Sequence, residues 1–238
     1  MIPNRLKKSL LDRHGENGMI KKSFQLAEGF ALGRIPEEIQ NAFNDGTELT
    51  TVAIFSDLAG FSQRITGWPG RKINSLLNRY YNIAIPAIYQ SQGEIEKLIG
   101  DGIVAIFGPP FKNLESGILS AIIAGSKIIR SGLEKDLKTK VALRIGSGFF
   151  TYVGNQDYTE ATLVGPLLTE VFRLEEVAKP DSISVYAGTN ECKIMDAITN
   201  YINEQRQSRY KIKPSYEEIN LRGVSFRRVK HFTHFKAD

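Results

Sequence analysis

Asp57 is the first residue whose type and position could support chemistry. It lies in the segment Phe55-Ser56-Asp57-Leu58-Ala59-Gly60-Phe61-Ser62, at the end of the apolar, β-branched run 50–55 that is typical of a buried strand. A strand end is rigid, so it would hold the carboxylate accurately. The glycine-containing turn that follows would offer backbone N–H groups to a phosphate. Taken by itself, the segment fits equally well an aspartate that caps the following turn.

Asp101 is the second candidate, in Gly100-Asp101-Gly102 between the strand-like segments 94–99 and 103–107. Asp-Gly is an ordinary hairpin turn, which is the simpler explanation for this motif alone. If the hairpin lies beside the first strand, Asp57 and Asp101 meet at one sheet edge. Two adjacent carboxylates repel each other unless they share a proton or a cation. A pair of Mg²⁺ or Mn²⁺ ions would remove that repulsion and would suit in-line attack on a phosphorus atom.

The elements that must position these acids follow from the apolar pattern after residue 49. Helices are expected over 71–91, 114–133, 167–178 and 191–202, and strands over 50–55, 94–99, 103–107, 141–145, 161–164, 183–186, 218–221 and 226–232. Pro86 should kink or end the first helix. The mixed order predicts an α+β fold, with helices packed on one face of a mainly antiparallel sheet. A doubly wound parallel sheet would require strict alternation of strand and helix.

Length and composition are those of an ordinary globular protein. The chain has 238 residues, 42% hydrophobic and 24% charged, which predicts one domain over 49–238 and an N-terminal arm over 1–48 with a short helix at 36–44. The single cysteine, Cys192, excludes an intrachain disulfide and a multi-cysteine zinc site, and it suits a reducing, cytoplasmic setting. No apolar run approaches the roughly 20 residues that span a bilayer, so no membrane segment is expected.

The net charge of +5 is distributed unevenly along the chain. Residues 1–22 hold six Lys and Arg against two acids, and residues 201–238 hold nine against four, around an acidic middle. Basic ends are compatible with a polyanion-binding surface. Two solvated termini explain the pattern more simply, because the basic residues form no continuous stripe.

Four segments, in this order, resemble the class III nucleotidyl cyclases. They are Phe55–Ser62, Lys97–Gly108, Leu143-Arg144-Ile145-Gly146, and Thr162-Leu163-Val164-Gly165 followed by Arg173-Leu174-Glu175 and Ala178-Lys179-Pro180. They resemble, in turn, the first strand of that family, its metal-binding hairpin, the next strand, and a later strand with its helix. The resemblance covers about residues 50–232 and implies a cyclase catalytic domain with a palm-like, ferredoxin-type core over 49–238.

The resemblance implies conversion of a nucleoside triphosphate to a 3′,5′-cyclic nucleotide and pyrophosphate. Two divalent metal ions, Mn²⁺ or Mg²⁺, would be held by Asp57 and Asp101 with help from the backbone carbonyl of Leu58, and Phe61 and Ser62 would contact the substrate. Since a metal ion lowers the pKa of the attacking ribose hydroxyl, no histidine base is required. The three histidines, His14, His231 and His234, are therefore expected to be bystanders.

The family places each site between two cyclase domains, so the resemblance also implies a homodimer. One chain would supply the metals to a site, and the other would supply the contacts to the base and to the transition state. Lys97 and Thr162 fall where the family contacts the base, and Arg144 falls where an arginine approaches the terminal phosphates. The alternative for Lys97 is a solvent-exposed lysine at the edge of a strand, with no role in binding.

Arg173 falls where the family stabilises the charge that builds on the α-phosphate, a role that suits a guanidinium because it stays charged at any pH. The alternative for Arg173 is a surface ion pair with Glu170 or Glu176. Thr169 replaces the asparagine that usually orients the ribose. Its hydroxyl can form a hydrogen bond but has a shorter reach.

Other departures also concern the nucleotide side. Gly165 is followed by Pro166 and Leu167 in place of polar or small residues, and the glycine-rich segment 146–150 is one residue short. The family has a basic residue in its last strands, and the simplest alignment places Val224 at that position. Arg222, Arg227 and Arg228 are the nearby basic residues that could take its role. We therefore expect an active enzyme with an unusual nucleotide pocket.

The preferred base is the least determined property. Lys97 with Thr162 resembles the pairing of many bacterial adenylate cyclases. The short chain with an N-terminal arm instead resembles the prokaryotic cyclases of the Pycsar anti-phage type, which make cyclic UMP or cyclic CMP to activate a separate effector. This second resemblance favours UTP or CTP, with ATP and then GTP as the alternatives.

Three other classes of protein are alternatives to a class III cyclase. Diguanylate cyclases carry a Gly-Gly-acid-Glu-Phe turn where this chain has Gly100-Asp101-Gly102-Ile103-Val104, and no P-loop sequence is present. A degenerate cyclase that only binds nucleotide or RNA is the third. Retention of Asp57, Asp101 and Arg173 argues against it, because binding alone does not require all three, so nucleic acid is an unlikely partner.

Overall fold

The computed structural model describes residues 37–44, 46–155, 157 and 159–237, and the chain divides into two compact units. The smaller unit comprises residues 1–48 and Phe149–Val164, and the larger comprises Leu49–Gly148 and Gly165–Asp238. Residues 1–36 of the predicted arm lie outside the described part. The short helix predicted for the arm is present as α3 (Glu37–Asn44).

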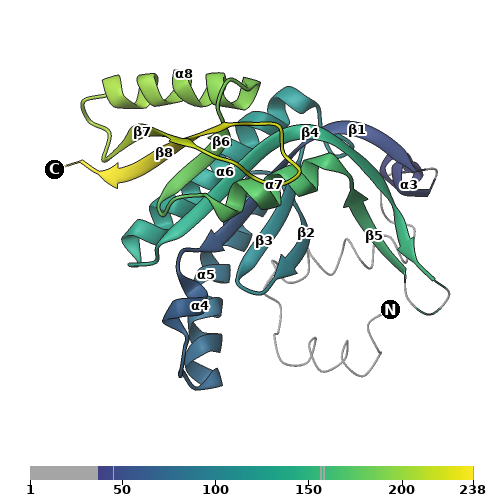
Figure 1. Ribbon diagram of the computed structural model, residues 1–238, viewed down its shortest axis with the longest axis horizontal. Coiled ribbons are helices and arrows are strands. Elements are labelled where there is room, and N and C mark those ends of the chain that lie inside the picture. The colour runs from purple at the N-terminus through teal and green to yellow at the C-terminus, as the bar shows by residue number, and fades with distance from the viewer. Residues whose placement is uncertain (1–36, 45, 156, 158, 238) are drawn as a thin grey trace. The chain divides into compact units, whose positions relative to one another are not determined.

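The larger unit is built on a mainly antiparallel sheet, as the sequence predicts (Figure 1). Its strands follow the order β2-β3-β1-β4-β6-β8-β7. Their bounds are β1 Thr47–Leu58, β2 Glu94–Ile99, β3 Gly102–Phe107, β4 Thr139–Gly154, β6 Ser182–Tyr186, β7 Tyr210–Glu218 and β8 Arg228–Lys236. The β4–β6 pair is parallel, whereas β1–β3, β2–β3, β6–β8 and β7–β8 are antiparallel. The predicted α+β class is therefore confirmed.

Helices cover both faces of this sheet, which corrects the prediction of a single covered face. On one face, Val52 and Ile54 of β1 join a core with α5 (Gly70–Gln90), α6 (Leu114–Glu134) and α8 (Asn190–Glu204).

Phe55, which points the other way because side chains alternate along a strand, packs edge-on against Phe172 of α7 (Pro166–Glu176), with ring centroids 5.3 Å apart. Figure 1 shows α7 in front of the sheet and α5 behind it. The apolar stripe of α7 (Leu167, Val171 and Leu174, all buried) explains why this helix also needs a sheet face.

Several element boundaries differ from those predicted. Pro86 does not end α5, which continues to Gln90. Strand β4 runs from Thr139 to Gly154, well beyond both ends of the predicted strand at 141–145. The last two strands lie at 210–218 and 228–236, so the predicted strand at 218–221 falls mostly in the connecting loop. Pro214 concealed β7 because proline is tolerated in a strand only at a sheet edge, and β7 is the edge strand.

The smaller unit pairs the distal half of β4 with β5 (Thr159–Val164) in an antiparallel hairpin. The ring of Phe43, from α3, lies 5.4 Å from that of Phe150, edge to face. A Cβ on Gly46 would lie 2.4 Å from Phe149 Cζ, so the aromatic ring packs directly on the glycine backbone. Thr162 lies in this unit, opposite Thr151.

Candidate active site

The register between β1 and β3 determines where the two aspartates lie. Ser56 is the Cα partner of Ile103 in this antiparallel pair, so the next residue, Asp57, falls opposite Gly102 and beside Asp101. The two carboxyl groups are within hydrogen-bonding reach of each other. The structure therefore brings together, at one sheet edge, the two acids that the sequence singles out.

The hairpin turn that carries Asp101 is fixed on both sides. Gly100 has a φ of 62°, a left-handed conformation that suits glycine at the start of a two-residue loop. The Tyr81 hydroxyl of α5 donates a hydrogen bond of 2.6 Å to the Gly100 carbonyl. On the other side, a Cβ on Gly102 would lie 2.1 Å from Phe55 Cε2, so the Phe55 ring packs against bare backbone. Asp101 is therefore held in place by helix and strand together.

Burial and the neighbouring acid disfavour the ionised form of Asp57. Desolvation, the hydrogen bond with Asp101 and the Asp101 charge raise the pKa of Asp57 from 3.8 to about 7, while Lys140 and the backbone N–H of Leu58 act in the opposite direction. Asp101 Oδ2 is buried and has no hydrogen-bond partner in the described part of the chain. A buried oxygen in this state destabilises the fold unless a ligand satisfies it.

A cavity of about 240 Å³ opens onto these groups. Its walls come from the end of β1, the following turn, α4 (Phe61–Arg64) and the β2–β3 loop. Asp57, Leu58, Phe61, Ser62 and Asp101 all line it. These are the predicted metal ligands and two of the predicted substrate contacts, so one cavity collects the whole metal side of the predicted site.

The donor set of this cavity fits a hard divalent cation. Carboxylate and carbonyl oxygens are the ligands that Mg²⁺ and Mn²⁺ favour. A cation would relieve the repulsion between Asp57 and Asp101 and would satisfy the buried Asp101 oxygen. The described residues contain no cluster of three or more His, Cys, Asp or Glu side chains suited to a metal. Two carboxylates supply fewer ligands than the full coordination shell of such a cation.

Two further charged side chains belong to this site and were not predicted. Lys140 of β4 lines the cavity, with its Nζ 3.6 Å from Asp57 Oδ2. The same ammonium forms an ion pair with Glu175 of α7. A lone lysine at a strand start gives no sequence signal, and Glu175 was noted only as part of a motif. Their convergence depends on how α7 packs on the sheet.

The nucleotide-side candidates of the larger unit are engaged with acids outside the cavity. Lys97 Nζ lies 3.4 Å from Glu96 Oε1. Arg144 is held between two acids, with its Nε 2.6 Å from Glu170 Oε2 and its Nη1 2.8 Å from Glu191 Oε1. Its predicted phosphate contact would use N–H donors that these acids leave open, or would follow release from one of the acids.

Arg173 and Thr169 both lie on α7, and neither lines the cavity. Arg173 is partly exposed and pairs with Glu176, which is one of the two surface pairings considered above. Thr169 is exposed in the first turn of the helix. Pro166, an apparent departure from the cyclase pattern, is the first residue of α7, where proline is well tolerated because no intrahelical N–H bond is lost.

The remaining candidates lie elsewhere. Thr162 belongs to the smaller unit. Val224 is buried, and Arg228 pairs with Glu218 across the last hairpin. Burial lowers the pKa of both His231 and His234 to about 4, so these side chains are neutral at physiological pH.

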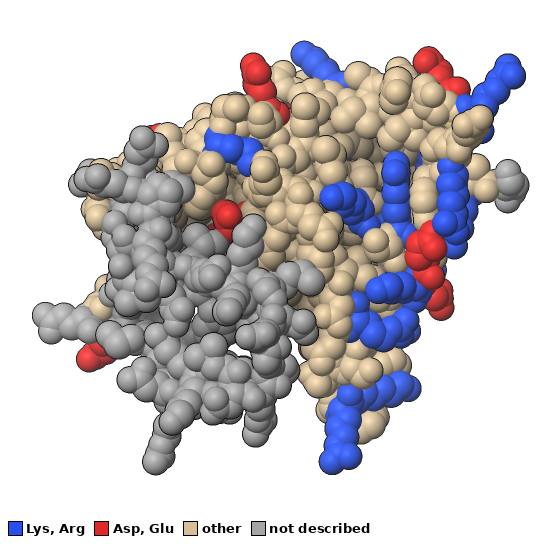
Figure 2. Space-filling view, turned by 180° about the vertical axis from the view of Figure 1, so that it is seen from behind, with Lys and Arg blue, Asp and Glu red and all other residues tan. Residues whose placement is uncertain are grey.

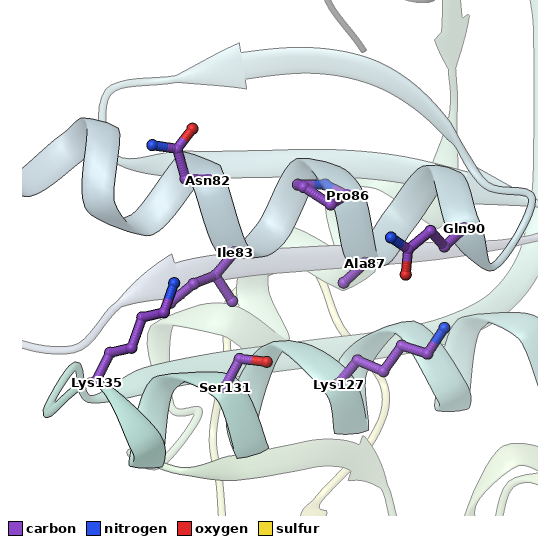
Figure 3. A pocket seen from close by; sticks show the side chains of 8 residues that line it. All are labelled: Asn82, Ile83, Pro86, Ala87, Gln90, Lys127, Ser131 and Lys135. Atoms are coloured by element: carbon purple, nitrogen blue, oxygen red, sulfur yellow. The ribbon is translucent and has the colours of Figure 1, made fainter. Parts of the chain in front are cut away.

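A larger cavity, of about 350 Å³, lies between α5 and α6 (Figure 3). Ile83 and Ala87 of α5 point towards α6, and Lys127 and Ser131 of α6, together with Lys135 just after that helix, line the other side. No carboxylate lines this cavity, so it offers no ligand set for a divalent cation. The smaller cavity at Asp57 and Asp101 is therefore the candidate active site.

No protein-family model matches the sequence. Among curated proteins, the chain is 28% identical over 137 residues to the uncharacterized protein Rv1320c of Mycobacterium tuberculosis, covering 56% of this chain and 24% of that protein. It is 27% identical over 153 residues to the terminal-differentiation-specific adenylate cyclase of Dictyostelium discoideum, covering 60% of this chain and 7% of that protein. The chain thus spans about a quarter, or less, of the length of these relatives.

Solved structures of cyclases share the fold. The adenylyl cyclase CyaB from P. aeruginosa gives a TM-score of 0.64 at 17% identity, covering 81% of this chain and 97% of that chain. The guanylyl cyclase Cya2 gives 0.62 at 19% identity, covering 81% and 95%. The guanylate cyclase domain of RhGC from Catenaria anguillulae, in complex with GTP, gives 0.60 at 16% identity, covering 80% and 100%.

Within the described ranges, no helix combines the length and the apolar character that crossing a bilayer requires. The element order, the sheet and these likenesses together show that the chain has the α+β fold of class III adenylyl and guanylyl cyclase catalytic domains.

Proposed function

We propose that this protein is a nucleotidyl cyclase. The ribose 3′-oxygen of a nucleoside triphosphate loses its proton and bonds to the α-phosphorus, the bond from that phosphorus to the β-phosphate oxygen breaks, and pyrophosphate leaves. The observation that carries the proposal is the contact between Asp57 and Asp101 in an open cavity, with one Asp101 oxygen buried and unsatisfied.

The metal side of the reaction follows from these acids. Two divalent cations would lower the pKa of the 3′-hydroxyl and offset the charge on the α-phosphate and on the departing pyrophosphate. Asp57 and Asp101 bind cations only when both are ionised, and the Leu58 backbone N–H and Lys140 favour ionised Asp57. Phe61 and Ser62, on the cavity wall, would position the triphosphate.

A shared site between two chains accounts for the position of Arg173. Its side chain does not line the cavity that holds Asp57 and Asp101 of the same chain. In a homodimer, Arg173 would instead stabilise the α-phosphate charge at the partner's metal side, with Thr169 near the ribose. Arg144 would contact the terminal phosphates.

The base is the finer part of the proposal. Lys97 and Thr162 are the residues proposed to contact it, and the resemblance to Pycsar cyclases favours UTP or CTP. The product would then act on a separate effector as an antiviral signal. ATP is the alternative substrate. Because the solved structures that share the fold include an adenylyl and a guanylyl cyclase, both ATP and GTP must be tested beside UTP and CTP.

The direct test is incubation with Mn²⁺ and each of the four nucleoside triphosphates separately, with the products identified by mass. We expect one cyclic nucleotide and stoichiometric pyrophosphate. Asp57→Ala should abolish both while keeping the circular dichroism spectrum of the wild type. If a properly folded wild-type protein yields no cyclic product from any of the four substrates, the proposal is wrong. Cyclic AMP alone would reject only the pyrimidine preference.

The dimer proposal has its own test. Asp57→Ala and Arg173→Ala chains are each expected to be inactive. When they are mixed and exchange chains freely, one site in each heterodimer keeps both residues. Since half of the dimers would then be heterodimers with one intact site of two, about a quarter of wild-type activity should return. No recovery, with chain exchange shown by a labelled subunit, would reject the shared site.

An RNA-binding module is less well supported. Figure 2 shows Lys and Arg side chains projecting at several places on one face, with Asp and Glu between some of them. Near the C-terminus, Arg209 pairs with Glu134 and Arg228 pairs with Glu218. Such pairing reduces the charge available to a polyanion.

A further inference from the structure

Lys140 is placed where one positive charge serves two acids. Its Nζ lies 3.6 Å from Asp57 Oδ2 and also forms an ion pair with Glu175. All three side chains are largely shielded, with exposed fractions of 17% for Lys140, 17% for Asp57 and 15% for Glu175. Charges at such distances interact more strongly here than on an open surface, because less water screens them.

The two acids that share Lys140 belong to different parts of the proposed machinery. Asp57, at the end of β1, is a proposed metal ligand. Glu175 lies on α7, two residues after Arg173. It is not among the residues that line the cavity, although its carboxyl group lies close enough to Asp57 to interact with it. Lys140 therefore lies between Asp57 on the metal side and α7, the helix that carries Arg173, the proposed transition-state arginine.

A divalent cation at Asp57 changes the balance between these two pairings. The cation and the Lys140 ammonium would compete for the same carboxylate, and like charges at this separation repel each other. Glu175 is the alternative partner that lets the ammonium leave Asp57 without becoming a buried, unpaired charge. Burial raises the pKa of Glu175, the hydrogen bond and the charge of Lys140 lower it, and the nearby Asp57 raises it further.

We infer that Glu175 is a positioning residue for metal binding: it withdraws Lys140 from Asp57 when a divalent cation binds, and the strengthened Lys140–Glu175 pair then ties α7 more firmly to β4. The inference rests on the proposed function, because it assumes that Asp57 is a cation ligand. It assigns a role to two side chains that are not themselves proposed as metal ligands.

The test measures Mn²⁺ binding to the nucleotide-free full chain by the electron paramagnetic resonance signal of free Mn²⁺. Four proteins form a double-mutant cycle: wild type, Glu175→Gln, Lys140→Met and the double variant. Glu176→Gln is the matched control, because it removes the same charge from the next position, where the side chain pairs with Arg173 instead. Asp57→Asn serves as the reference for loss of the cation site.

In Glu175→Gln, Lys140 has only Asp57 as a partner, so we expect Mn²⁺ to bind about tenfold more weakly than in wild type. In the Lys140→Met background, the same Glu175→Gln change should alter affinity less than about twofold. The Glu176→Gln control should bind like wild type. An equal loss in both backgrounds would overturn the inference, since Glu175 would then act through its own field and not through Lys140.

The outcomes separate this inference from the proposed function. If wild type binds no Mn²⁺, or if Asp57→Asn binds it equally well, the metal site itself is absent and both ideas fail. If binding depends on Asp57 but Glu175→Gln binds like wild type, only the role of Glu175 and Lys140 is rejected.

A measurement on unaltered protein covers the case in which a variant does not fold. Hydrogen–deuterium exchange of the α7 backbone amides should slow by severalfold when saturating Mn²⁺ is added, because the released ammonium strengthens the contact with Glu175. Helix α8, none of whose residues forms an ion pair with Lys140 or Glu175 in the described part of the chain, should exchange at an unchanged rate. Unchanged exchange in α7 under saturation would contradict the proposed link to that helix.

Discussion

Replacing Asp57 by asparagine should stabilise the metal-free protein at neutral and alkaline pH while abolishing Mn²⁺ binding. The reason is the raised pKa of Asp57, which moves from 3.8 to about 7 through burial and the adjacent Asp101. The folded protein holds this proton more tightly than the unfolded chain does. The associated stability is therefore fully present below pH 3.8 and is lost as the pH rises towards 7. An asparagine cannot ionise, so it escapes this loss.

The size of the effect follows from the same values. Between pH 3.8 and about 7, the wild type should lose about 1.4 kcal/mol of unfolding free energy for each pH unit, relative to the variant. The difference between the two proteins should therefore reach about 4 kcal/mol at pH 8. Asp181 also has a raised pKa, mainly through burial, but it is present in both proteins and largely cancels in the comparison. Glu175 cancels only in part, because Asp57 is one of the groups that raise its pKa.

Urea unfolding of both proteins at half-unit steps from pH 5 to pH 8, in the presence of a chelator, measures this difference. We expect it to grow steadily and to level off above pH 7. Adding Mn²⁺ at pH 8 should then stabilise the wild type and leave the variant unchanged. A difference that stays constant across the range would refute the reasoning, because it would mean that Asp57 ionises without penalty beside Asp101.

Three further outcomes are expected. Arg173→Ala should lower kcat on the order of 100-fold with little change in KM, because the arginine would act on transition-state charge; a change confined to KM in steady-state kinetics would contradict that role. Tyr81→Phe removes the 2.6 Å hydrogen bond to the Gly100 carbonyl and should destabilise the fold by about 1 kcal/mol. Because the turn that carries Asp101 is then less fixed, Mn²⁺ should also bind severalfold more weakly. Loss of stability with unchanged Mn²⁺ affinity would show that this hydrogen bond does not position Asp101 for metal binding. Gly102→Ala should destabilise the protein by roughly 2 kcal/mol or more in urea unfolding, since its Cβ would lie 2.1 Å from Phe55 Cε2; near-wild-type stability would show that the Phe55 ring can move aside.

The sequence predicted most elements whose apolar pattern is strong and uninterrupted. The helices α5 and α6 and the β2–β3 hairpin appear where their periodicity placed them. The C-terminal hairpin was misplaced, because Pro214 and the alternating lysines of β7 suit only an edge strand, and edge position is a property of the assembled sheet. The sequence also did not predict that helices cover both faces of the sheet. The apolar stripe of an amphipathic helix shows that it packs on a sheet but not on which of the two faces.

The meeting of the two aspartates at one sheet edge could be predicted because both residues carry local signals. Asp57 ends a buried strand and Asp101 sits in a two-residue hairpin loop, and antiparallel pairing of neighbouring strands is enough to bring them together. The acids that hold Arg144 could not be foreseen, because Glu170 and Glu191 come from two different helices. The acid with which each basic side chain pairs depends on how the helices pack. Exposed ion pairs contribute little to the stability of that packing, so the charged residues of the sequence do not reveal it.

The order of residues alone thus determined the element types, the fold class and the two aspartates, because periodicity, turn chemistry and strand ends are local properties of the chain. Tertiary structure alone decided that Asp57 is buried against Asp101 and that Lys140 divides its charge between Asp57 and Glu175. The physical reason is that electrostatic energies depend on distance and on the exclusion of water, and both are set only when strand and helix pack together.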